Sequence, residues 1–302
     1  MRRVTKIKIL IPFVIILFLG AYGRHRHFSR EIDISGTLDG KQMNEISGIA
    51  ASHTMPDIYY VHNDSGDTSR FFAISPDGKL KSTIYYAGDQ KAKGHLGAYD
   101  CEDIAVGPGP AQGKSYVYLG DIGDNSAERR YLTIYRMEEK AAWLNNATAN
   151  ADAVPLHLKY PDGPRDAETL MVDPIEKLIY IVSKRQDSVS VYTTPLSYKP
   201  NDTVTLTRRC KLFFTGLKVF KWITAGDISM DGSQIVLKSY EKVYYWKRNG
   251  NEPVWKTLQT KPEEPLYVPE KQGEAIGFTP DGKGYYTTSE GVYSPIYFYK
   301  TP

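Results

Sequence analysis

The stretch that decides the fold is Glu168-Thr-Leu-Met-Val172, followed by a turn and by Leu178-Ile-Tyr-Ile-Val182. Short runs of β-branched and aromatic residues on both sides of a turn predict two antiparallel strands. The same order of an acidic residue, small or apolar residues, a turn and a second strand recurs elsewhere in the chain. The other four copies begin at Glu45 (EISGIA), Glu102 (EDIAV), Asp227 (DISM) and Glu274 (EAIGF).

These five copies are spaced by 57, 66, 59 and 47 residues. Four-stranded propeller blades repeat at about 40–50 residues, so the spacing indicates blades with loop insertions. Helical periodicity is nearly absent after residue 30, and only Lys140–Ala149 is a fair helical stretch. The sequence therefore predicts an all-β protein built from blades.

Each repeat divides into about four strands. In the second repeat these are Glu102–Val106, Tyr116–Leu119, Tyr131–Arg136 and Pro155–Tyr160, and in the third they are Glu168–Val172, Leu178–Val182, Ser188–Thr193 and Val204–Phe214. The last repeat has room for only three strands before Pro302, and Glu31–Gly36 supplies a fourth from the other end of the chain. Pairing the two termini closes the ring and removes a free sheet edge. We expect a five-bladed β-propeller, with six blades as the alternative if one repeat is degenerate.

The first thirty residues differ from the rest. A basic stretch (Met1–Lys8) precedes an apolar one (Ile9–Tyr22), and a second basic stretch ends at Arg30. This order predicts a signal peptide or an N-terminal membrane anchor at 1–30, ahead of a single propeller domain at 31–302. Fourteen apolar residues are fewer than the ~20 that cross a bilayer, which favours the signal peptide. Both interpretations predict export to the periplasm or the extracellular space, with membrane contact only through residues 9–22.

The net charge of +3 hides an acidic body. Seven basic and no acidic residues lie in residues 1–30, so 31 basic and 35 acidic residues remain in the rest. An acidic body argues against nucleic-acid binding, which needs a basic face. Two cysteines exclude a disulfide scaffold and a Cys-rich zinc module. Export would permit a Cys101–Cys210 disulfide, but the fold places them on an inner and an outer strand. We expect a monomer.

The acidic residue that opens each repeat lies at the start of an inner strand, and all inner strands begin at one end of the propeller channel. We therefore expect an acidic ring at this mouth, with hard oxygen ligands that suit calcium. In the alternative, each acid accepts backbone N–H groups and holds the blades in register. The predicted metal ligands are Glu45, Glu102, Glu168, Asp227 and Glu274.

The loops after the second strands should crowd the same mouth, and all five are polar. Within 62–67 and 120–125 we select His62, Asp64 and Asp121 as candidate catalytic residues that orient water or substrate, with His95 a further possible base. Turns stabilised by Asx hydrogen bonds are the alternative interpretation of these loops. Four cations are expected to bind an anionic substrate: Arg165, Lys184, Arg185 and Lys238.

Six motifs in the sequence resemble those of a known group of proteins. In chain order they are VHNDSGD, EDIAVGPG, YLGDIGDN, DAETLMVDP, TAGDISMDG and QGEAIGFTPDG. Together they resemble a group of exported bacterial β-propeller proteins over residues 46–302. More remotely, one acid per blade resembles the calcium-dependent propeller hydrolases, which include phytase-like and lactonase-like enzymes. That resemblance implies a central calcium held by the five repeat acids, although the phytase phosphate-binding signature is absent.

Three functions stay open at this point. The first is a calcium-dependent hydrolase of phosphoesters or lactones. The second is a non-catalytic propeller that binds a protein, glycan or small ligand at the same face. In the third, the ring is structural and partners dock on outer strands, where Trp246 and Trp255 lie.

Overall fold

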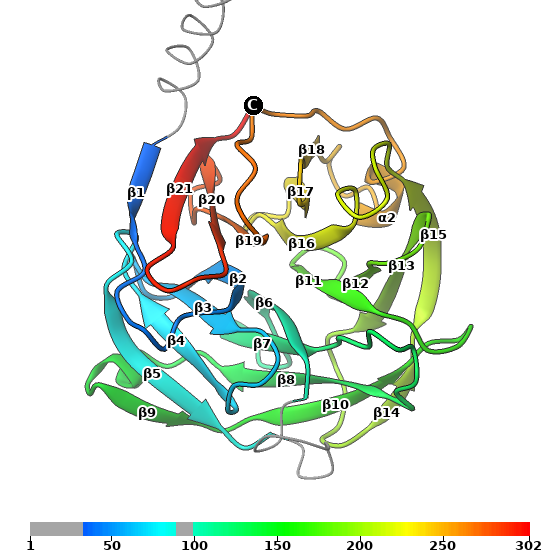
Figure 1. Cartoon of the computed structure of the whole chain (residues 1–302). Coiled ribbons are helices and arrows are strands. Elements are labelled where there is room, and N and C mark those ends of the chain that lie inside the picture. The colour runs from blue at the N-terminus through cyan, green and yellow to red at the C-terminus, as the bar shows by residue number, and fades with distance from the viewer. Residues whose placement is uncertain (1–32, 89–98) are drawn as a thin grey trace, which may run out of the picture.

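A computed structural model describes residues 33–88 and 99–302, which form five twisted sheets around a central axis (Figure 1). Besides strands, the described residues contain only two one-turn helices, η1 (Ala141–Leu144) and α2 (Val254–Thr257). The prediction of an all-β, five-bladed propeller is confirmed, and the alternative of six blades is wrong.

Each sheet is one blade, and its strands run mainly antiparallel from the channel outward. Blade 1 contains β2 (Ile46–Ala51), β3 (Tyr59–Asn63), β4 (Arg70–Ile74), β5 (Leu80–Tyr86) and β9 (Thr148–Ala151). Blade 2 contains β6 (Cys101–Pro108), β7 (Ser115–Asp121), β8 (Leu132–Glu138), β10 (Val154–Lys159) and β14 (Thr203–Thr205). Blade 3 contains β11 (Ala167–Asp173), β12 (Leu178–Ser183), β13 (Ser188–Pro195) and β15 (Thr207–Phe213). Blade 4 contains β16 (Ile223–Ile228), β17 (Gln234–Ser239) and β18 (Val243–Lys247). Blade 5 contains β19 (Gly273–Phe278), β20 (Gly284–Ser289), β21 (Pro295–Lys300) and β1 (Asp33–Thr37).

The ring closes through the two ends of the described chain. Strand β1 pairs antiparallel with β21, from Asp33 opposite Phe298 to Thr37 opposite Pro295, and the two lie side by side in Figure 1. The expected pairing of the terminal strands is therefore confirmed. It leaves β21 with a partner on both sides, so this strand has no open edge.

The five inner strands pack against one another in the order β2, β6, β11, β16, β19 and back to β2. Small residues allow this close approach. A Cβ atom at Gly277 would lie 2.3 Å from the carbonyl oxygen of Ile49 in β2, so a side chain at this position would push two blades apart. Because the inner strands are held this close, residues at their starts share one narrow channel mouth.

Two strands cross to a neighbouring blade, which the sequence did not predict. The stretch Val204–Phe214 was expected to be one strand, but its first part is β14, which pairs parallel with β10 of blade 2, and its second part is β15 of blade 3. The helical stretch Lys140–Ala149 forms only the single turn η1 before β9 pairs parallel with β5. Trp143 of η1 packs edge-on against Tyr60 and Phe71, which ties this turn to the core.

The core lies between adjacent blades, in five clusters of buried aliphatic and aromatic side chains. Trp246 is buried in the cluster between blades 3 and 4, and Trp255 packs against the same cluster. These two residues stabilise blade packing, so they do not form the exposed outer surface that the third functional alternative requires. Cys101 lies on inner strand β6 and Cys210 on outer strand β15, and both are free thiols.

The predicted signal peptide or anchor at 1–30, Glu31 of the expected strand Glu31–Gly36, and His95 lie outside the described residues. Within residues 33–88 and 99–302, no helix is long and apolar enough to cross a bilayer.

Candidate functional site: an acidic channel mouth

The five inner strands are in the same register at the channel mouth. Each of them has a bulge at its second residue, where its pairing with the second strand of the blade shifts by one. The five residues at this bulge are therefore equivalent. They are Ser47, Glu102, Glu168, Thr224 and Glu274.

A second equivalent position lies two residues earlier. There the carbonyl oxygens of Glu45, Asp100, Asp166 and Gln272 accept hydrogen bonds from the first or second residue after the second strand. These donors are the backbone N–H groups of Asp64, Gly123, Lys184 and Glu290, at 2.8–3.2 Å. The shared hydrogen bond fixes the loop residues beside the inner strands, so their side chains reach the mouth as well.

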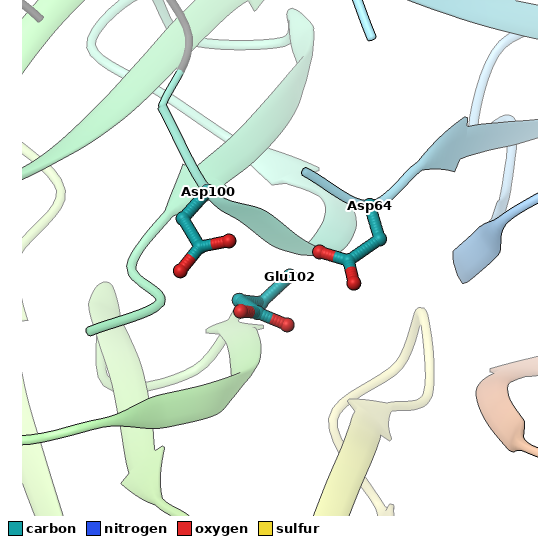
Figure 2. Close-up of side chains that lie close together, drawn as sticks. All are labelled: Asp64, Asp100 and Glu102. Carbon is teal, nitrogen blue, oxygen red and sulfur yellow. The ribbon is translucent and has the colours of Figure 1, made fainter. Parts of the chain in front are cut away.

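The carboxylates at these positions gather closely. Asp64, Asp100 and Glu102 each offer an oxygen within 4.8 Å of the other two, and Figure 2 shows the three side chains converging from blades 1 and 2. Two further groups meet the same limit: Glu102 with Asp166 and Glu168, and Asp64 with Glu274 and Glu290. Because Glu102 and Asp64 each belong to two groups, the three groups form one continuous cluster, which we call the mouth cluster.

Burial makes this cluster electrostatically costly. Glu102 and Glu168 are each only 3% exposed. Burial, together with neighbouring carboxylates, raises the pKa of both side chains well above the ordinary glutamate value. Oε2 of Glu168 is buried with no hydrogen-bond partner among the described residues, and no donor there contacts the carboxylate of Glu102. Unsatisfied buried carboxylate oxygens of this kind are rare and call for a cation or a proton.

One resident cation neutralises part of the cluster. The Lys184 ammonium donates to Oε1 of Glu168, lies 3.7 Å from Oε1 of Glu274 and donates to the Tyr240 hydroxyl at 3.1 Å. The Tyr240 hydroxyl in turn donates to Glu274 at 2.5 Å. Burial opposes the charge on Lys184, but Glu168 and Glu274 outweigh burial and raise the lysine pKa. Lys184 therefore compensates the blade 3 and blade 5 side of the cluster. Among residues 33–88 and 99–302, no cation lies within ion-pair distance of Asp64, Asp100 or Glu102.

The backbone at Gly123 lies directly against that uncompensated side. A Cβ atom at Gly123 would lie 2.1 Å from Oε1 of Glu102 and 2.4 Å from Oδ2 of Asp100. Glycine is the residue type that leaves room for both carboxylates beside the loop. This close approach gives the motif YLGDIGDN a physical reason for its second glycine.

The expected convergence of five repeat acids is met for three of them. Glu102, Glu168 and Glu274 occupy equivalent ring positions, whereas Glu45 lies on the exposed rim, at the position of Asp100 and Asp166. Asp227 does not join them. It lies beside His53, Met230 and Pro280, near the loops at the opposite end of the channel.

Asp227 holds two blades in register, which is the role that the alternative interpretation gave to the repeat acids. Its Oδ1 accepts the N–H of Ile228 at 2.8 Å, and its Oδ2 accepts the N–H of Phe278 in blade 5, also at 2.8 Å. Asp103 does the same between blades 2 and 3, through Ile104 and Leu170. The sequence thus contains both kinds of acid, and Glu102 and Glu168 differ from Asp227 because they accept no such backbone pair.

The three candidate catalytic residues lie in different surroundings. Asp64 is in the mouth cluster, where burial raises its pKa to about 7. His62 is buried beside Gly48, its Nδ1 lies 2.8 Å from the Asn63 carbonyl, and burial lowers its pKa to about 4. Asp121 is buried in an ion pair with Arg129 at 2.7 Å and accepts two backbone N–H groups. Of the three, Asp64 is the one that faces the mouth.

The four cations proposed for substrate binding also separate. Lys184 lies in the mouth cluster, and Arg185 donates to Asp166 at 2.5 Å on its rim. Arg165 packs over the rings of Tyr160 and Tyr192 and pairs with Asp162 at 2.8 Å, away from the cluster.

Lys238 is fully buried between blades 4 and 5. It bonds to the Gly273 carbonyl and lies 3.6 Å from Glu270. Lys184 and Arg185 are therefore the cations available to a ligand at the mouth.

Sequence reasoning missed four members of the site. They are Asp100, Asp166, Tyr240 and Glu290. A signal for the first two exists in the printed sequence, because the spacing Asp-x-Glu occurs at Asp100–Glu102 and again at Asp166–Glu168. Tyr240 and Glu290 lie in loops that follow second strands, which were expected at the mouth, but nothing in the sequence singles out these two residues within the loops.

Comparisons with known proteins identify no family for this chain. No protein-family model matches the chain, and no curated protein matches it. One similar solved structure is that of a luciferin-regenerating enzyme, with 14% sequence identity and a TM-score of 0.46, covering 87% of this chain and 93% of that chain. At this similarity the comparison carries no argument about fold or activity. The strand pairing itself establishes that the chain is a five-bladed β-propeller.

Proposed function

We propose that the channel mouth binds a divalent cation, calcium by preference, and that the propeller uses it to hydrolyse an anionic phosphoester or a lactone. The observation that carries the proposal is the Asp64–Asp100–Glu102 group, whose carboxylate oxygens lie within 4.8 Å of one another with no cation at ion-pair distance among the described residues. The neighbouring Glu168 also has a buried Oε2 with no hydrogen-bond partner there. Carboxylates in this state need a cation to remain charged in a buried site.

The spacing of the oxygens allows each acidic group to share one ion. Calcium binds oxygen at about 2.3–2.6 Å, so two ligands on opposite sides of one ion lie about 4.6–5.2 Å apart. The oxygens within each acidic group lie within 4.8 Å of one another. All the donors are carboxylate oxygens, which suit calcium better than zinc or copper. Glu102, Asp100 and Asp64 would hold the ion, since Lys184 already compensates Glu168 and Glu274.

The remaining residues of the mouth suit a negatively charged substrate. When bound, a divalent cation supplies Lewis-acid polarisation of a phosphoryl or carbonyl oxygen. Arg185 lies at the rim and would orient the anionic group through its guanidinium. Burial raises the pKa of Glu290 to about 7, so at neutral pH this half-buried carboxylate is able to accept a proton from an attacking water.

Export fits this proposal. We propose that residues 1–30 direct the propeller out of the cytoplasm, where calcium sites of modest affinity, about 10⁻⁴–10⁻³ M, are filled. A site with one resident lysine and several buried carboxylates fits this modest affinity better than it fits the higher affinity of a cytosolic calcium sensor.

Binding without turnover is the second candidate, and one observation favours it. Two of the three predicted catalytic residues, His62 and Asp121, are buried, with Asp121 held in an ion pair with Arg129 and His62 bonded through Nδ1 to the Asn63 carbonyl. A protein, glycan or small ligand would then bind over the mouth cluster without being cleaved.

Calorimetric titration of chelator-treated protein with calcium, followed by phosphoester and lactone screens with and without chelator, tests both candidates. Calcium binding with chelator-sensitive turnover supports the hydrolase, and calcium binding without turnover supports the binding protein. A folded sample that binds neither calcium nor magnesium would overturn the cation site on which both depend.

A further inference from the structure

An exposed apolar segment joins blade 3 to blade 4. Four large apolar side chains lie exposed between residues 213 and 220: Phe213 (68% exposed), Leu217 (69%), Val219 (48%) and Phe220 (44%). We call residues 213–220 the apolar loop. A single exposed apolar side chain is ordinary on a protein surface, but several in one short loop indicate an interaction site.

The same region is strongly basic, although the body of the protein is acidic. Residues 203–226 contain five basic residues and no acidic ones: Arg208, Arg209, Lys211, Lys218 and Lys221. Lys211 and Lys218 are exposed, and neither forms an ion pair within the described residues. Lys221 lies 4.8 Å from the centre of the Phe213 ring, so a cation and an exposed aromatic ring are presented together.

We propose that the apolar loop docks on an anionic membrane surface. Apolar side chains interleaved with lysines suit a bilayer interface, where the apolar groups enter the acyl boundary and the lysines meet lipid phosphates. This contact is additional to the one expected through residues 9–22. A single weak membrane anchor binds reversibly, whereas two signals together give stable attachment.

Docking of this loop would bring the channel mouth near the bilayer. The loop leads into Trp222, whose ring lies 5.0 Å from the guanidinium of Arg185. Arg185 in turn donates to Asp166 of the mouth cluster. The apolar loop is thus connected to the mouth cluster through the side chains of Trp222 and Arg185.

Local labelling tests the proposal with the full chain. In a Cys210→Ala background, Phe220→Cys is labelled with an environment-sensitive fluorophore, since the other cysteine, Cys101, is buried. Vesicles of phosphatidylglycerol and phosphatidylcholine carry nitroxide-labelled lipid as a quencher. We expect a blue shift and quenching at position 220. Met230→Cys is the matched control, because Met230 is 42% exposed but lies beside Asp231, and we expect no quenching there.

Charge provides the second arm. Lys218→Gln and Lys221→Gln should each lower the ratio of docked to undocked loop by roughly fivefold, as expected for one lysine at an anionic surface. Vesicles of phosphatidylcholine alone should give little quenching. Equal quenching at positions 220 and 230, or none at 220 while the protein is on the vesicle, would overturn the proposal, as would docking that the lysine variants leave unchanged. Leu217→Cys repeats the measurement if Phe220→Cys does not fold.

Discussion

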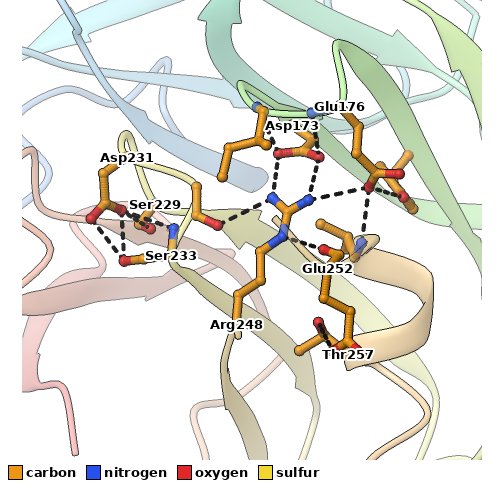
Figure 3. A network of polar contacts seen from close by, with 12 residues as sticks. Asp173, Glu176, Ser229, Asp231, Ser233, Arg248, Glu252 and Thr257 are labelled. Carbon is orange, nitrogen blue, oxygen red and sulfur yellow. Dashed lines mark hydrogen bonds and ion pairs between the residues drawn. The ribbon is translucent and has the colours of Figure 1, made fainter. Parts of the chain in front are cut away.

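Arg248 and Asp173 form a bidentate ion pair that joins blade 4 to blade 3 with no solvent exposure of either side chain, at 2.8 and 3.1 Å (Figure 3). Asp173 also accepts the N–H groups of Ile175 and Glu176, and Arg248 donates to the Glu252 carbonyl at 2.5 Å. Each guanidinium nitrogen of Arg248 and each carboxylate oxygen of Asp173 therefore has a hydrogen-bond partner, which distinguishes this buried pair from the channel mouth.

Arg248→Met should destabilise the propeller strongly. Removing the guanidinium leaves Asp173 charged, buried and without its cation, which costs about 3–5 kcal/mol in comparable cases. Chemical denaturation, monitored by tryptophan fluorescence, measures the loss. Lys283→Met is the matched control, because Lys283 pairs with Asp281 at 3.2 Å on the exposed surface. It should change the unfolding free energy by less than about 1 kcal/mol. Equal effects of the two variants would contradict the assigned role of the buried pair.

Gly123→Ala should block the proposed cation site without unfolding the blade. Its new methyl group would displace the carboxylates of Glu102 and Asp100, which are the mobile ends of side chains, while the fold around it is unchanged. Titration with calcium should show affinity reduced at least about tenfold. Gly120→Ala, three residues earlier, is the control, since its nearest contact is a Leu170 methyl at 3.2 Å. Unchanged calcium affinity in Gly123→Ala would place the ion elsewhere.

The sequence was sufficient to predict the architecture. The last repeat has room for only three strands, so the fourth strand of blade 5 had to come from the other end of the chain, where β1 lies. It was insufficient for the ring, because a bulge sets which residue faces the mouth. The acids Glu45 and Asp227 lie near the repeat position, but the bulge selects Ser47 and Thr224 instead. A shift of two or three residues cannot be recognised in a pattern of similar residue types, yet it moves a carboxylate from the mouth to the rim or to the far end of the channel.

Calcium affinity should rise between about pH 5 and pH 8. Burial raises the pKa of Asp100 to about 6 and of Asp64 and Glu290 to about 7, so the metal-free folded protein holds protons there. Unfolded carboxyls titrate near about pH 4, so the folded state binds more protons between about pH 4 and 7. These groups therefore stabilise the metal-free fold at low pH, and this stabilisation is lost as the pH rises through about 7.

Thermal unfolding across this pH range, with and without calcium, measures the effect. Calcium must displace the protons, so its stabilising effect should grow with pH. Asp64→Asn removes one titrating group and should flatten the pH dependence of the metal-free protein. A calcium effect that is constant from pH 5 to pH 8 would contradict the assignment of Asp64 and Asp100 as ligands.

Lys184→Met should separate the structural role of the lysine from that of the ion. Without calcium, Glu168 and Glu274 lose their cation, and the fold should lose about 3–5 kcal/mol, as when one partner of a buried pair is removed. With calcium, much of this loss should return, because the ion then has no ammonium competing for Glu168. The increase in melting temperature on adding calcium should thus be larger in Lys184→Met than in the native protein.

Two further variants complete this experiment. Lys242→Met removes a lysine that pairs with Glu264 at 2.7 Å on the exposed surface, and its response to calcium should match that of the native protein. Lys184→Met combined with Glu168→Gln removes both members of the buried pair, so it should recover metal-free stability and lose the extra calcium effect. If Lys184→Met instead weakens calcium binding, the lysine supports the occupied site, and the cation and the ammonium do not compete for the same carboxylates.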